Sequence, residues 1–115
     1  MYARKGNYAK SLEHYNKCLA IQTKFKGVDS IDVARTLQNI GRVYDYKGDY
    51  ANAIEHYNKF LEIQTKIKGA DSFDVAETLK SIGFVYRDKG DNMKAIENFN
   101  QCLEIKTQIL GPESA

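Results

Sequence analysis

The chain repeats itself every 42 residues, and this period constrains its fold more than any other feature. Residues 6–47 and 48–89 are identical at 27 of 42 positions, and residues 48–73 and 90–115 at 13 of 26. Repeated units of this size cannot each bury an apolar face alone, so the period predicts stacked units that share a continuous core. Six glycines mark the period in two series: Gly6, Gly48, Gly90 and Gly27, Gly69, Gly111.

Each unit contains two amphipathic helical patterns, which we name helix A and helix B. In the second unit helix A is predicted at Ile31–Lys47 and helix B at about Tyr50–Ile67. Apolar or small residues recur at spacings of three and four, as on one face of a helix. In helix A these are Ala34, Leu37, Ile40, Gly41 and Tyr44. In helix B the expected buried side is Ala53, Tyr57, Phe60 and Leu61.

Capping signals separate these helices. Ser30 suits an N-cap, Asp32 favours the positive end of the helix dipole, and Gly48 follows the last residue of helix A. The only proline is Pro112, so the chain can be helical almost throughout. Connections of a few residues force neighbouring helices to run antiparallel. An all-α stack of antiparallel helix pairs is therefore expected.

The repeat register also predicts the organisation of the chain, a single repeat domain in the helix order B-A-B-A-B. Residues 1–5 match the last turn of a helix A, and no helix A follows the last helix B. Both terminal B helices, near residues 7–26 and 91–110, should therefore expose apolar side chains. We expect self-association through them, by end-to-end stacking or helix exchange. The predicted parts are a partial repeat at 1–27, full repeats at 28–69 and 70–111, and the start of a truncated linker at 112–115.

Composition argues against several functional classes. The net charge is only +2 with acids and bases mixed, so nucleic acid is not an expected partner. The apolar runs are a few residues long, which argues against a membrane span. The N-terminus has no apolar signal-peptide core, and a cytoplasmic location is expected.

The spacing of large, small and aromatic residues resembles the tetratricopeptide repeat family. The 42-residue period, longer than the usual period of about 34, and the linkers at 27–34 and 69–76 resemble repeats of the kinesin light chain type. The resemblance implies a right-handed α-solenoid that acts as a protein–protein interaction scaffold. The residues that carry it are Leu37, Ile40, Gly41, Tyr44, Gly48, Tyr50, Ala53, Tyr57, Phe60 and Leu61, and in the next unit Leu79, Ile82, Gly83, Tyr86, Gly90, Ala95, Phe99, Cys102 and Leu103.

Residues that could carry chemistry have structural interpretations. Cys18 and Cys102 occupy one repeat position two units apart, roughly 30 Å in stacked helices. A disulfide needs Cα atoms within about 7 Å, so the two should not pair in one monomer. His14 and His56 are also repeat equivalents and should be solvated. No metal-ligand spacing, phosphate loop or nucleophile elbow occurs, so we expect no enzyme activity, no metal and no cofactor.

The two A helices differ along one arc of the helical wheel. At 100° per residue the six changed positions of residues 32–47 lie between about −80° and +40°, and the ten unchanged positions between about 60° and 260°. We name the changed positions the variable arc and predict that it lines the concave face and binds an extended peptide or partner protein. By family resemblance, Asn39 would hold a peptide backbone, and Ser81 departs from that pattern. The arc consists of Arg35, Gln38, Asn39, Arg42, Asp45, Tyr46, Glu77, Lys80, Ser81, Phe84, Arg87 and Asp88.

Two alternatives remain open. In the first, the exposed residues of helix A have simply drifted, although helix B keeps residues expected to be exposed. In the second, the chain is a purely structural, self-associating segment of an array, natural or consensus-like, with no ligand of its own. The unchanged helix B residues are Glu13, His14, Asn16, Lys17, Gln22 and Lys24, matched by Glu55, His56, Asn58, Lys59, Gln64 and Lys66.

Overall fold

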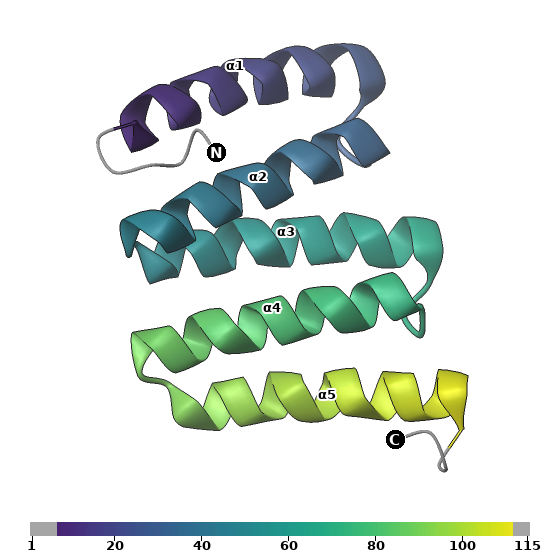
Figure 1. Ribbon diagram of the computed structural model, residues 1–115. Coiled ribbons are helices and arrows are strands. Elements are labelled where there is room, and N and C mark those ends of the chain that lie inside the picture. Colours follow the sequence, from purple (N-terminus) through teal and green to yellow (C-terminus); the bar gives the residue numbers. More distant parts are fainter. Residues whose placement is uncertain (1–6, 112–115) are drawn as a thin grey trace.

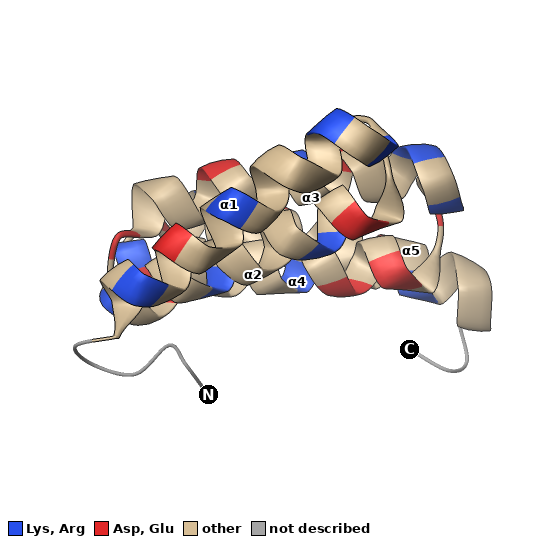
Figure 2. Ribbon diagram, turned by 90° about the horizontal axis from the view of Figure 1, so that it is seen from above, with Lys and Arg blue, Asp and Glu red and all other residues tan. Residues whose placement is uncertain are grey.

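The computed structural model describes residues 7–111 and shows five α-helices that lie side by side in chain order (Figure 1). The A helices α2 and α4 lie along one side of the stack, and the B helices α1 and α3 along the other (Figure 2). The described residues form an all-α solenoid of helical hairpins in the predicted order, with no strand among them. The helices are α1 (Tyr8–Lys26), α2 (Ile31–Lys47), α3 (Tyr50–Lys68), α4 (Phe73–Lys89) and α5 (Asn92–Leu110).

The predicted helix ends are confirmed at both ends of α2. The Ser30 hydroxyl accepts a hydrogen bond from the backbone N–H of Val33 at 3.2 Å. Gly48 adopts the left-handed conformation with φ of 89°, which favours glycine because it has no Cβ atom. The predicted last turn of a helix A at residues 1–5 and the linker start at 112–115 lie outside the described residues.

Two hairpin cores repeat the same contacts. Val33, Ala34 and Leu37 of α2 pack with Phe60 and Ile63 of α3. The equivalent cluster between α4 and α5 consists of Val75, Ala76, Leu79, Cys102 and Ile105.

A third cluster joins successive hairpins. Ala53, Ile54 and Tyr57 of α3 pack against Ile82 and Val85 of α4. The B helix α3 therefore contacts two A helices, α2 in its own hairpin and α4 in the next, which is the packing that makes a solenoid continuous.

The glycines inside the A helices allow helix A to lie close to helix B. A Cβ atom at Gly41 would lie 3.1 Å from Cδ1 of Tyr57, and one at Gly83 would lie 2.7 Å from Cε1 of Phe99. A larger side chain would force these rings to move, so the small residue sets how closely helix A lies on helix B.

The expectation that Gln22 and Gln64 are solvent-exposed is wrong. Gln64 is buried, and its Oε1 accepts a hydrogen bond from the Thr78 hydroxyl at 2.7 Å. Gln22 is half-buried and accepts from Thr36 in the same way at 2.6 Å. These pairs connect a B helix to the next A helix, so the unchanged glutamines reflect packing and do not serve as a control for drift.

The two cysteines singled out from the sequence lie apart from each other, whereas Cys18 Sγ lies 3.6 Å from Nε2 of His14 one turn away. Cys18 is half-buried on α1, and Cys102 is buried on α5, at opposite ends of the stack. His14 is exposed, whereas His56 is half-buried beneath the Tyr44 ring at 5.4 Å between centroids. Within residues 7–111 no group of three His, Cys, Asp or Glu could hold a metal ion. No described helix has the length and apolarity needed to cross a bilayer.

Candidate functional site

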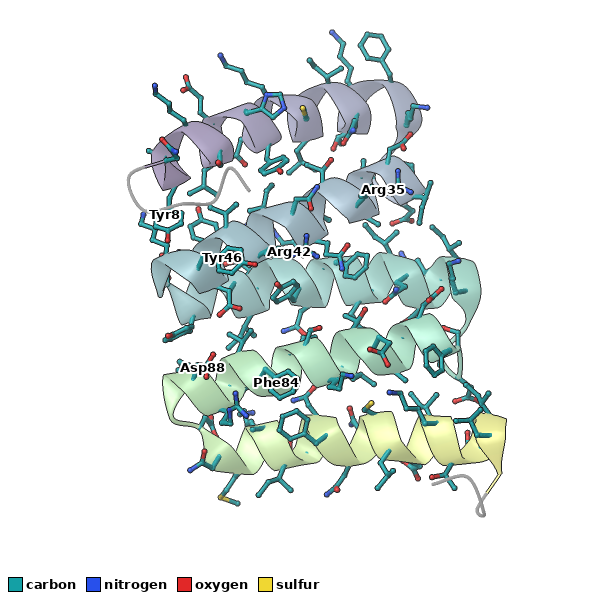
Figure 3. All side chains as sticks on the ribbon, in the orientation of Figure 1. Tyr8, Arg35, Arg42, Tyr46, Phe84 and Asp88 are labelled. Carbon is teal, nitrogen blue, oxygen red and sulfur yellow. The ribbon has the colours of Figure 1, made fainter. Side chains whose placement is uncertain are left out.

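The variable arc lies on the side of the A helices that faces away from the hairpin cores. None of its twelve residues is buried, whereas eight of the ten unchanged α2 positions are buried or half-buried apolar, small or threonine residues. Figure 3 shows Arg35, Arg42 and Tyr46 along α2, with Phe84 and Asp88 on α4, the next A helix. The comparison of the two A helices on a helical wheel therefore separates the side of helix A that packs in the core from the side that faces solvent.

The α2 part of the arc offers hydrogen-bonding groups that the described residues leave largely unused. Neither Arg35 nor Arg42 forms an ion pair with another described residue, although Arg42 hydrogen-bonds with Tyr57. The Asn39 amide is half-buried and makes no side-chain hydrogen bond within residues 7–111. A guanidinium presents several donors in a fixed plane, and an amide presents both a donor and an acceptor, so these groups suit a carboxylate or a peptide backbone.

Asp45 and Asp88 connect the two layers electrostatically. Partial burial, and then the charge of Asp88 on the neighbouring helix, raise the pKa of Asp45 above its ordinary value. Burial of the ring, followed by the nearby Asp45 carboxylate, raises the pKa of Tyr57 to about 12. Asp45 therefore lies at a partly desolvated point between α2 and α4, where a like charge disfavours its ionised form.

The arc residues on α4 form more contacts within the protein than the arc residues on α2. Glu77 pairs with Lys80 at 3.2 Å and with Lys106 of α5 at 2.6 Å, and the hydrogen bond from Lys106 holds the pKa of Glu77 below its ordinary value. The Ser81 hydroxyl donates to the backbone carbonyl of Glu77 at 3.2 Å. Ser81 is therefore a poor equivalent of Asn39.

Phe84 forms an aromatic platform on this side of α4. Its ring packs edge to face on Phe99 at 5.1 Å between centroids, and the Arg87 guanidinium lies 4.8 Å from its centroid. The ring nevertheless remains exposed. Such a pre-positioned ring offers apolar contact area with little loss of side-chain freedom.

Two features of the structure are missing from the sequence prediction, one beside the variable arc and one on α1. Lys106 belongs to helix B, yet it reaches Glu77 and lies 5.1 Å from the centroid of the Phe73 ring. In the sequence, the signal for this contact is that Lys106 replaces the glutamine found at the equivalent repeat positions 22 and 64. The second feature is a cavity of about 410 Å³ along the first turns of α1, lined by Asn7, Lys10, Ser11, His14 and Tyr15.

These observations define the class of protein: it is a solenoid of helical hairpins whose A helices carry a polar, partly aromatic surface. The tetratricopeptide repeat family profile matches residues 1–66, and a second tetratricopeptide repeat profile matches residues 76–109. The chain belongs to the tetratricopeptide repeat family. Repeats of this family generally mediate protein–protein interaction or scaffolding.

Solved structures support the longer repeat type. The nearly identical TPR-like repeats of a candidate kinesin light chain from Podosopora anserina superpose with a TM-score of 0.78 at 19% identity, covering 94% of this chain and 51% of that chain. BtubC (BKLC) from P. vanneervenii superposes with a TM-score of 0.55 at 19% identity, covering 96% and 61%. The chain thus spans about half the length of the first of these structures. No curated protein matches the chain in sequence.

Proposed function

We propose that the chain is an interaction scaffold that binds an extended peptide, or an extended segment of a partner protein, along the variable arc. The observation that carries the proposal is the coincidence of sequence change with solvent exposure on one side of both A helices. On that side Arg35, Asn39 and Arg42 keep free hydrogen-bonding capacity, and Phe84 offers an exposed ring. Arginine and aromatic residues are enriched among the residues that dominate binding energy.

The partner would lie across α2 and α4 in turn. Its backbone would meet Asn39 and the guanidinium of Arg42, and an apolar side chain would rest on Phe84. Asp45 and Asp88 flank this path, so the arc presents both signs of charge over a short distance. Mixed charge favours one partner over another more than it raises affinity.

Alanine substitution of the arc is expected to weaken peptide binding. A displayed peptide library should yield ligands for the unmodified chain, and Arg42→Ala, Asn39→Ala and Phe84→Ala should each weaken at least one selected ligand by about tenfold, about 1.4 kcal/mol. Titration calorimetry or fluorescence anisotropy would measure the affinities.

Matched controls lie on the exposed side of α3. Asn58→Ala and Lys59→Ala alter exposed residues outside the arc and should leave the affinities unchanged. Selected ligands that bind all three arc variants as tightly as the unmodified chain would exclude the variable arc as the binding surface.

The second candidate function, a structural segment that associates with itself, is favoured by the terminal B helices. Ile21 and Phe25 of α1 are exposed, as are Met93, Ile96 and Leu103 of α5. If these surfaces associate, light scattering over a concentration series should show a rising mass, and Ile96→Lys with Leu103→Lys should reduce it. A monomer at every concentration would contradict self-association and leave the arc proposal unaffected.

A further inference from the structure

An aromatic ring from helix B lies against the glycine of helix A in both the α2–α3 and the α4–α5 hairpin. A Cβ atom at Gly41 would lie 3.1 Å from the Tyr57 ring, and one at Gly83 would lie 2.7 Å from the Phe99 ring. In each hairpin the ring also meets the residue that follows the glycine, and this residue belongs to the variable arc. One helix B residue therefore contacts the arc from beneath in each layer.

The two hairpins differ in the chemistry of this contact. In the α2–α3 hairpin, the Arg42 guanidinium donates a hydrogen bond to the hydroxyl oxygen of Tyr57. In the α4–α5 hairpin, Phe84 and Phe99 occupy the equivalent positions and pack edge to face at 5.1 Å between ring centroids. The same position of the repeat therefore carries a polar pair in one layer and an apolar pair in the other, with both members changed together.

The hydroxyl of Tyr57 lies among residues of the variable arc. It interacts electrostatically with Asp45, Arg42 and Tyr46, and burial of the ring is the main cause that raises the pKa of Tyr57 to about 12. The hydroxyl therefore stays neutral at neutral pH. A neutral hydroxyl oxygen takes up one N–H of a guanidinium and leaves its charge and its other donors available. Tyr57 thus fixes the position of Arg42 without neutralising it.

We propose that Tyr57 and Phe99 are positioning residues that determine which partner group each layer of the variable arc accepts. In the first layer, Tyr57 orients the Arg42 guanidinium toward an oxygen acceptor on a partner side chain. In the second layer, Phe99 supports the Phe84 ring beneath an apolar partner side chain. Both supports reduce the side-chain freedom that is lost on binding. This assignment rests on the proposed peptide function and adds two helix B residues to a site predicted on helix A alone.

A double-mutant cycle tests the role of Tyr57 on peptides selected from a displayed library against the unmodified chain. Tyr57→Phe keeps the ring that packs on Gly41 and removes only the hydroxyl, so the circular dichroism of the helices should not change. It should weaken peptides that depend on Arg42 by about fivefold, the loss expected for one net hydrogen bond. In an Arg42→Ala background the same substitution should change affinity by less than about twofold, because the side chain that Tyr57 orients is gone.

Tyr44→Phe provides the matched control. It also removes a hydroxyl from a tyrosine that is not fully exposed, but Tyr44 lies outside the arc and stacks on His56. The affinities of the selected peptides for this variant should equal those for the unmodified chain.

Exchanging the pairs between layers tests the chemistry of each position. Arg42→Phe with Tyr57→Phe gives the first layer the apolar pair, so the library should now yield an apolar residue where the unmodified chain selects an acidic or amide residue. The reciprocal exchange, Phe84→Arg with Phe99→Tyr, should replace the apolar preference of the second layer by acidic or amide residues. The sequences of the selected peptides show whether the acceptor is a carboxylate or an amide oxygen.

The proposal is overturned if Tyr57→Phe has no effect on affinity, or has the same effect with and without Arg42. Unchanged residue preferences after both exchanges would overturn it as well. These results leave the peptide proposal in place as long as Arg42→Ala itself weakens binding. A library that yields no ligand, or ligands that tolerate every arc variant, would instead overturn the proposed function and this assignment together.

Discussion

Ile54→Ala is expected to lower the free energy of unfolding by about 2–5 kcal/mol, the range for truncating a buried isoleucine. Ile54 is 8% exposed and packs in the cluster that joins α3 to α4, with Ile82 and Val85. The substitution removes apolar surface and leaves a cavity between two rigid helices. Chemical denaturation followed by circular dichroism would measure the change.

Ile96 provides a matched control within the same chain. It occupies the same repeat position on α5 and has the same side chain, but it is 57% exposed. Ile96→Ala is therefore expected to change the free energy of unfolding by less than about 1 kcal/mol. Equal losses for the two variants would show that contact with the next helix A does not determine the stability contribution of this position.

Thr78→Val is expected to lower the free energy of unfolding by about 1–3 kcal/mol. The Thr78 hydroxyl donates to Oε1 of buried Gln64 at 2.7 Å. Valine has nearly the same shape but no donor, so the Gln64 oxygen would stay buried without its partner. Denaturation of the single variant would measure this loss.

The double variant separates hydrogen bonding from packing. Gln64→Leu together with Thr78→Val removes both polar partners, so most of the loss should be recovered. The pair of Gln22 and Thr36 remains as an internal copy at the preceding repeat junction. A double variant as unstable as the sum of the single variants would show that the two side chains act independently.

The helices themselves were predictable because their signals are local. Ser30 and Gly48 lie at the two ends of α2, and both act within one turn of the backbone. The core stripe was predictable for the same reason, since a spacing of three and four residues places side chains on one face of any helix. The place of Gly41 in that stripe was predictable, and the structure adds how closely it approaches Tyr57.

The error at Gln64 has a physical cause. A polar side chain on a helical wheel is expected in solvent unless a partner is known, and the partner here is Thr78, 14 residues away on the next helix. The repeat comparison showed that this glutamine does not change between the first two B helices, but it gave no reason. A buried polar pair and a freely exposed residue look alike in a single sequence.

The variable arc was likewise only partly predictable from the sequence. Its twelve residues could be identified from the sequence, and the structure places all of them outside the buried core. Which of them keep free hydrogen-bonding groups could not be predicted. Glu77 is held by Lys106 from α5, while Arg35 on α2 has no acidic partner among the described residues.

The sequence by itself determined the helices, their order, the 42-residue unit and the arc of change on helix A. These depend on capping, periodicity and repetition, all of which act over short distances along the chain. Only the tertiary structure decided that Gln64 is buried against Thr78 and that Lys106 pairs with Glu77. The reason is that these contacts join side chains on different helices, and a repeat pattern predicts which helices are neighbours but not which side chains pair between them.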